Sequence, residues 1–209
     1  FLPGGFSGAD EPDGSGKFIT SFLRNEEISE ELMKLLDERD GLVAGICNGF
    51  QALIKLGLLP YGEIGVQQSD SPTLTFNNIG RHQSKLVRTK VCSTKSPWLR
   101  RASVGQVLTV PISHGEGRFI ANDNDIDTML ENGQILTQYV DFEGNPTMDI
   151  RFNPNGSTMA IEGILSPDGR ILGKMGHSER IGKGLYKNVP GEFELGMFES
   201  AVSYFRCEE

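Results

Sequence analysis

The stretch GLVAGICNGFQALIKLGLL, residues 41–59, constrains the fold more than any other part of this sequence. Its first half is apolar at successive positions, as expected of a strand that is buried on both faces and paired in parallel. Its second half repeats apolar residues at helical spacing and is closed by Gly57. A buried strand that passes at once into a helix predicts an α/β protein, with Cys47 at the junction.

The five residues GICNG, 45–49, have the glycine-x-nucleophile-x-glycine form of an elbow between a strand and a helix. Such a sharp turn strains the backbone of the nucleophile, and the two glycines allow the strand and the helix to approach closely. The helix N-terminus favours a thiolate at Cys47, and the amide of Asn48 is free to donate to an oxyanion. The alternative is a buried structural cysteine. Cys92 and Cys207 have no such setting, and we interpret both as ordinary.

The rest of the sequence predicts helices before the elbow and strands after it. Helices are expected over 17–25 and over 29–40, where Ser29 suits an N-terminus, and the tail of residues 192–206 is amphipathic. Alternating segments separated by turns predict strands at TLTFN (73–77), SKLVRTKVC (84–92), QVLTVPISH (106–114), ILTQYVD (135–141) and TMAIEGILS (158–166). We therefore expect a parallel first half and a more antiparallel second half.

Composition excludes several classes of function. A net charge of -8 without a basic patch argues against nucleic acid as a main partner. No apolar run approaches the roughly 18 residues of a membrane span, so no membrane partner is expected. Three cysteines without paired spacing are typical of the reducing cytoplasm, where we expect this protein. The acidic segment 121–130 lacks the glycine and the final glutamate of a calcium loop, so we expect no metal site.

A thiol nucleophile needs a base, and the chain has three histidines. His82 has no acidic neighbour and is expected in a surface loop. His114 is followed two residues later by Glu116, and His177 is followed in the same way by Glu179. In extended backbone this spacing places both side chains on one face, where the carboxylate can orient the ring. Chemistry alone leaves the two pairs as equal candidates.

Several separated stretches resemble one family of enzymes. PGGFSG (3–8), GICNGFQ (45–51), SHGEGRF (113–119) and GHSERIGKGLY (176–186) resemble the class I glutamine amidotransferases. They are most similar to the glutaminase domains of phosphoribosylformylglycinamidine synthases, and the resemblance covers most of the chain. It implies one glutamine amidotransferase domain over 1–209, with a flavodoxin-like fold in which helices flank a parallel central sheet beside a smaller antiparallel portion.

The resemblance, rather than the spacing, assigns the triad. It implies that Cys47 is the nucleophile, that His177 is the base, and that Glu179 is the acid that orients it. The family usually has proline between the last two, where this chain has Ser178.

The same resemblance implies substrate-binding residues. A second oxyanion amide falls on Gly5, to act beside that of Asn48, and the family's glutamine that holds the substrate falls on Gln51. The stretch HGEGR is expected beside the active site or at the interface with a synthetase, and its candidate residues are His114, Glu116 and Arg118.

The reaction implied by the resemblance is the hydrolysis of L-glutamine to glutamate and ammonia. The ammonia would feed a synthetase domain, fused or separate, that converts formylglycinamide ribonucleotide to the amidine in purine biosynthesis. ATP and magnesium are expected in that synthetase, and no cofactor is expected in this domain. The segment DGSGK, residues 13–17, is too short and acidic for a phosphate-binding loop.

Two alternatives remain at this stage, a cysteine hydrolase or stress protein of the related elbow-bearing type and a noncatalytic interaction domain. The first would not need the HGEGR and HSER stretches, and the second would not need a nucleophile with its base and acid. The opening FLPGG also looks like the end of a strand. We therefore expect an N-terminally incomplete domain, the C-terminal portion of a longer polypeptide, with Phe1 near the strand that ends at Ile46.

Overall fold

The computed structural model describes residues 1–5 and 14–206 of this chain. Cys207, which the sequence marks as ordinary, and the second half of the leading PGGFSG stretch, residues 6–8, lie outside the described residues. Within the described part, no helix has both the length and the apolar character that crossing a bilayer would require.

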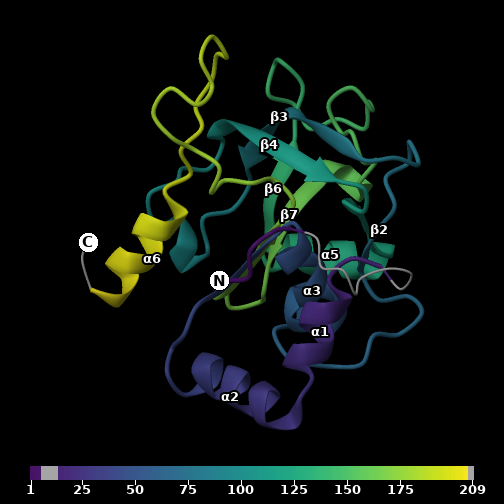
Figure 1. Ribbon diagram of the computed structural model, residues 1–209, viewed down its shortest axis with the longest axis vertical. Coiled ribbons are helices and arrows are strands. Elements are labelled where there is room, and N and C mark those ends of the chain that lie inside the picture. The colour runs from purple at the N-terminus through teal and green to yellow at the C-terminus, as the bar shows by residue number, and fades with distance from the viewer. Residues whose placement is uncertain (6–13, 207–209) are drawn as a thin grey trace.

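A six-stranded mixed sheet forms the centre of the molecule (Figure 1). In spatial order its strands are β1 (Val43–Ile46), β8 (Ile171–Lys174), β7 (Ile161–Leu165), β6 (Ile135–Tyr139), β3 (Gln83–Val91) and β4 (Val107–His114). A separate antiparallel pair consists of β2 (Thr73–Thr75) and β5 (Arg118–Ile120). The α/β class expected from the sequence is confirmed, and β1 with β8 is the parallel pair, while the other neighbours in the sheet are antiparallel.

The helices lie mainly toward the β1 and β8 end of the sheet. They are α1 (Lys17–Leu23), α2 (Glu26–Asp37), α3 (Asn48–Leu56), α4 (Leu58–Tyr61), α5 (Asp123–Glu131) and α6 (Met197–Phe205). Helix α3 packs against β1 and β8. Helix α1 packs against α3, as Figure 1 shows. Helix α6 stands apart from them, near the C-terminus, and packs against the short turn Pro97–Leu99.

Helix α2 begins earlier than the sequence pattern suggests. We expected its start near Ser29, but the side chain of Asn25 accepts a hydrogen bond from the amide of Ile28 and caps the helix. Asparagine is among the strongest N-cap residues, and the acidic Glu26 and Glu27 then suit the first turn. The prediction was wrong because a second capping signal stood four residues upstream.

Strands β1 and β8 bring the elbow and the last histidine to one edge of the sheet. All four residues of each strand are buried, as expected for strands covered on both faces. Gly173 makes room for helix α3, because a β-carbon there would lie 2.1 Å from Cδ2 of Phe50. The carboxyl ends of the two parallel strands lead directly to Cys47 and to the segment of His177.

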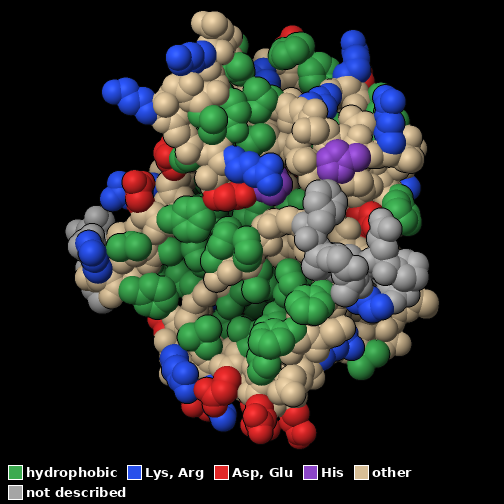
Figure 2. All heavy atoms as spheres, viewed as in Figure 1, with side chains coloured by type: hydrophobic (Ala, Val, Ile, Leu, Met, Phe, Trp, Pro, Cys, Tyr) green, Lys and Arg blue, Asp and Glu red, His purple; other side chains and the backbone are tan. Residues whose placement is uncertain are grey.

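The first residues run beside β1, as expected. Leu2 is paired in parallel with Gly45. Its amide donates to the carbonyl of Ala44 at 2.8 Å, and its carbonyl accepts from the amide of Ile46 at 3.0 Å. Apolar side chains gather on the face that Figure 2 shows, in the region of the N-terminus, α1 and α6. Among the exposed ones are the rings of Phe1 and Phe198, whose centroids are 5.2 Å apart.

Candidate active site

The elbow at Cys47 has the strained backbone that its sequence predicts. Cys47 has φ 53° and ψ -107°, a conformation that side-chain-bearing residues rarely adopt, directly between β1 and α3. A β-carbon on Gly45 would lie 2.6 Å from the carbonyl carbon of Gly49, and one on Gly49 would lie 2.2 Å from the carbonyl oxygen of Leu2. Both glycines are therefore required by close backbone approach, and the side chain of Cys47 projects at the end of the sheet.

Burial dominates the chemistry of the thiol. It raises the pKa of Cys47 to about 11, although the backbone N–H of Asn48, the charge of Arg180 and the backbone N–H of Gly5 all lower it. The helix-terminal amide lowers the pKa of the thiol, as the sequence predicts, but loss of solvation outweighs this effect in the free protein. Two amides nevertheless face the sulfur, those of Asn48 and Gly5.

His177 and Glu179 form a close pair at the thiol. Nδ1 of His177 lies 2.6 Å from Oε1 of Glu179, and the ring is buried. Burial opposes ionisation of Glu179, but the hydrogen bond from His177 holds the pKa of this carboxyl below its ordinary value. The other ring nitrogen, Nε2, has no hydrogen-bond partner in the described residues. A β-carbon on Gly4 would lie 2.6 Å from Cε1 of His177 and 3.2 Å from Cβ of Cys47, so both side chains pack on this glycine.

His114 and Glu116 have the same spacing but are not bonded to each other. The imidazole of His114 is buried, and neither of its nitrogens has a partner in the part of the chain that is described. Burial, with the nearby rings of His82 and His177, lowers its pKa to about 4. The carboxylate of Glu116 instead accepts a hydrogen bond from the amide of Ser15 at 3.1 Å. Of the two candidate pairs, the structure connects only the second.

The HGEGR stretch is held in place by a residue that the sequence did not single out. Asn77 is buried and donates from its side chain to the carbonyl of His114 at 2.9 Å. Its side-chain oxygen accepts from the amide of Gly117 at 3.1 Å, and its own amide donates to the carbonyl of Gly115 at 2.9 Å. Hydrogen bonds from one side chain to loop backbone leave no periodicity or motif, so no signal in a single sequence could have identified this residue.

The remaining candidates are Gln51 and Arg118. Gln51 is buried in α3 and donates its side-chain amide to the carbonyl of Glu116, which joins the elbow helix to the HGEGR stretch. Arg118 begins β5, and its Nε is buried without a partner in the described chain. Sγ of Cys47 lies 3.7 Å from the carbonyl oxygen of Ser113. The end of β4 therefore forms one wall of the site.

The ordinary cysteine and the surface histidine have hydrogen bonds of their own. Cys92 is partly buried, and its thiol donates to the side chain of Gln138 at 3.3 Å. His82 is exposed, and its Nε2 lies 3.0 Å from the hydroxyl oxygen of Ser113.

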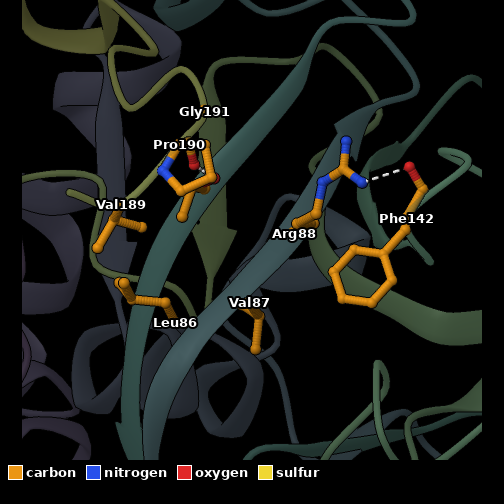
Figure 3. Close-up of a pocket in the computed structure, with 8 residues that line it drawn as sticks. Leu86, Val87, Arg88, Phe142, Val189, Pro190 and Gly191 are labelled. Atoms are coloured by element: carbon orange, nitrogen blue, oxygen red, sulfur yellow. Dashed lines mark hydrogen bonds between the residues drawn. The ribbon is translucent and has the colours of Figure 1, made fainter.

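A separate cavity of about 550 Å³ lies over β3 and β4 (Figure 3). In this view Arg88 and Phe142 stand on one side and Val189, Pro190 and Gly191 on the other. A guanidinium nitrogen of Arg88 donates to the carbonyl of Phe142 and completes that wall. No residue that lines this cavity belongs to the thiol site.

Comparison with known proteins gives consistent results. The family model for the CobB/CobQ-like glutamine amidotransferase domain matches residues 1–205. The phosphoribosylformylglycinamidine synthase subunit PurQ of Methanococcus maripaludis is 36% identical over 197 residues, which cover 93% of this chain and 68% of that protein. The corresponding subunit of Salinibacter ruber is 33% identical over 205 residues, which cover 97% and 77%.

The fold is also similar to a solved structure, and the similarity extends to a much longer protein. The structure of PurLQS from Thermotoga maritima matches with a TM-score of 0.68 and 29% identity, covering 97% of this chain and 77% of that one. The phosphoribosylformylglycinamidine synthase of Dictyostelium discoideum is 34% identical over 178 residues, which cover 85% of this chain and 13% of that protein.

Proposed function

This chain belongs to the family of CobB/CobQ-like glutamine amidotransferase domains, and we propose that it hydrolyses glutamine with Cys47, His177 and Glu179 as its triad. Within the family it is the glutaminase part of a phosphoribosylformylglycinamidine synthase, an enzyme of purine biosynthesis. The observation that carries the triad is the pair of His177 and Glu179, which packs against the same glycine as the elbow thiol. Nε2 of this histidine has no hydrogen-bond partner among the described residues.

The buried thiol determines the first step. Because the pKa of Cys47 is about 11 in the free protein, a base must remove its proton as the sulfur attacks the side-chain amide carbon of glutamine. Nε2 of His177 takes this proton, and Glu179 stabilises the imidazolium through Nδ1. The oxyanion of the tetrahedral intermediate is stabilised by the amides of Asn48 and Gly5, the two that approach the sulfur.

The same histidine then acts as an acid. It donates its proton to the leaving nitrogen, which departs as ammonia and leaves a γ-glutamyl thioester on Cys47. A water molecule attacks the thioester, His177 removes a proton from this water, and the proton returns to the sulfur as glutamate leaves. One proton-carrying group therefore serves both halves of the reaction.

Glutamine binding involves the HGEGR stretch in this proposal. Gln51 fixes the carbonyl of Glu116, and the buried ring of His114 offers two nitrogens that have no partner in the described part of the chain. A substrate with both an α-amino and an α-carboxylate group needs donors and acceptors that are already desolvated and held in place.

The ammonia serves a second reaction outside this chain. We assign the acceptor, formylglycinamide ribonucleotide, to the synthetase that the family name implies, which converts it to the amidine with ATP and magnesium. The partners are therefore glutamine and that synthetase.

The test is glutamate release from glutamine by the purified protein, measured with and without a synthetase loaded with nucleotide and formylglycinamide ribonucleotide. We expect release that increases when the loaded synthetase is present. Absence of glutamate release under both conditions would contradict the proposed activity, and release that ignores the synthetase would contradict the assigned partner.

A further inference from the structure

Lys174, the last residue of β8, is a fully buried lysine. Lysine is almost never fully buried unless its charge is paired. Its ammonium group has three hydrogens, and three acceptors surround it: the carbonyl of Gly176 at 3.2 Å, the hydroxyl of Ser178 at 3.0 Å and Oε1 of Glu162 at 3.3 Å. The ammonium group therefore makes two hydrogen bonds to the loop and an ion pair with Glu162.

Glu162, on the neighbouring strand β7, is the buried counter-ion. Its Oε1 also accepts from the backbone amide of Gly176 at 2.5 Å, and its Oε2 accepts from the hydroxyl of Thr137 on β6. The backbone carbonyl of Glu162 accepts a hydrogen bond from the amide of Met175 at 3.1 Å. The carboxylate is thus bonded on both oxygens and is fixed to three strands of the sheet.

This network surrounds the base without including it. The two loop acceptors of Lys174 come from Gly176 and Ser178, one residue before and one residue after His177. The backbone carbonyl of Lys174 also accepts from the amide of Cys47 at 2.9 Å. One residue therefore bonds the nucleophile through its backbone and the loop of the base through its side chain.

The loop fits closely onto the network. A β-carbon on Gly176 would lie 2.8 Å from Oε1 of Glu162 and 2.6 Å from Cγ1 of Val110. The amide of His177 is fixed on the other side, where it donates to the carbonyl of Pro111 at 2.9 Å. The backbone on either side of the imidazole has little room to move.

We propose that Lys174, Glu162 and Ser178 form a positioning network that holds His177 at the distance and angle at which it serves Cys47. The inference rests on the proposed function, since it assigns His177 to the chemistry. Ser178, which stands where the family usually has proline, supplies the third acceptor for the buried ammonium. Relative to apolar residues of similar volume, a buried ion pair contributes little net stability. We therefore explain the buried pair of Lys174 and Glu162 by its effect on the position of His177 and not by a gain in stability.

The first experiment changes Ser178 by one oxygen atom. In Ser178→Ala, kcat for glutamine hydrolysis should fall between about tenfold and a hundredfold at unchanged KM, because the base is displaced while the substrate contacts remain. Ser178→Thr, which keeps the hydroxyl, should restore kcat. Both are measured on the full protein with the synthetase present, beside circular dichroism and the melting temperature.

Ser166 provides the matched control. It is also buried and lies directly after β7, in the turn that leads to the start of β8, at the other end of β8 from Ser178. Its hydroxyl accepts from the amide of Ile171 at 3.0 Å. Ser166→Ala should lower the melting temperature without changing kcat. A folded Ser178→Ala with the wild-type kcat, or an equal loss of kcat in Ser166→Ala, would overturn the inference.

A second measurement does not depend on turnover. The rate of Cys47 alkylation by iodoacetamide at neutral pH, followed by mass spectrometry of its peptide, reports whether a base stands at the thiol. It should be lower in Ser178→Ala and restored in Ser178→Thr, and equal rates in all three proteins would overturn the inference. If the wild type alkylates with this pattern but releases no glutamate from glutamine, the proposed function fails while the positioning network stands.

Discussion

The segments around His114 and His177 share their spacing but differ in almost every contact. Each has a histidine at or shortly after the carboxyl end of a strand of the central sheet and a glutamate two residues later. In the second, the ring and the carboxylate are bonded at 2.6 Å. In the first, Glu116 bonds the amide of Ser15 and the imidazole has no partner in the described chain.

The difference shows what the spacing can and cannot determine. In extended backbone, residues two apart place their side chains on one face, but the first segment leaves its strand directly after His114 and the second leaves its strand at Met175, before His177. The turn after β8 is fixed by Lys174 and Glu162, while the turn after β4 is fixed by Asn77. Contacts from distant strands therefore decide which histidine acquires a carboxylate.

The comparison of the two histidine segments assumes that the thiol of Cys47 is the group that reacts. Cys47→Ala should abolish glutamine hydrolysis and thioester formation, a loss on the order of 10⁴-fold or more, because no other nucleophile stands at the elbow. Cys92→Ala, a change at a thiol bonded to Gln138, is the control and should retain activity. Hydrolysis that survives in Cys47→Ala would remove the basis of the comparison.

Replacing the two histidines tests the comparison directly. His177→Ala should slow thioester formation by a factor on the order of 10² to 10⁴, because the thiol loses its base. His114→Ala should still form the thioester when glutamine is saturating, which rapid-quench trapping can measure. The opposite result, with thioester formation lost only in His114→Ala, would exchange the roles of the two segments.

Replacement of the two glutamates should give a smaller difference in kcat than replacement of the two histidines. Glu179→Gln removes the charge that stabilises imidazolium and should reduce kcat on the order of 10²-fold. Glu116→Gln keeps an oxygen that can accept from Ser15 and should leave kcat almost unchanged. Steady-state kinetics of both variants measures the contrast, and equal losses in kcat would show that both carboxylates serve the reaction.

The imidazole of His114, which has no partner among the described residues, should make the stability of the protein depend on pH. Its pKa is about 4 in the fold and about 6.5 in the unfolded chain, so the unfolded state binds more protons between these values. Stability should therefore fall as pH decreases through this window, by about 3 kcal/mol from this group, and the loss should be complete below pH 4. Urea unfolding at pH 7 and pH 4 should show a smaller loss in His114→Gln. An identical loss in both proteins would mean that the ring is solvated or paired.

The sequence predicts the parts of this molecule that depend on local geometry. The elbow at Cys47 followed from two glycines and a change of periodicity, and its φ of 53° confirms the strained turn. Strand β8 was missed because its four residues, ILGK, are too short for a pattern, although they form the parallel neighbour of β1. Parallel pairing joins segments that are distant in the sequence, so local periodicity does not predict it.

The rest of the site depends on burial, which a single sequence does not contain. A lysine at the end of a strand is ordinarily solvated, and the counter-ion of Lys174 became visible only when β7 and β8 were placed side by side. The high pKa of Cys47 also results from burial. Helix amides act on the thiol locally, whereas its loss of solvation depends on every segment that packs around it.

The pairing of Leu2 with β1 also determines how precisely an anion can be bound at the sulfur. Its amide and carbonyl bond Ala44 and Ile46, and the chain reaches Gly5 three residues later. One residue of extended chain is about 3.3 Å long, so a slip of this pairing by one position would carry the amide of Gly5 beyond hydrogen-bonding reach. Tension on the first residues would therefore displace the amide of Gly5 that we propose as an oxyanion donor.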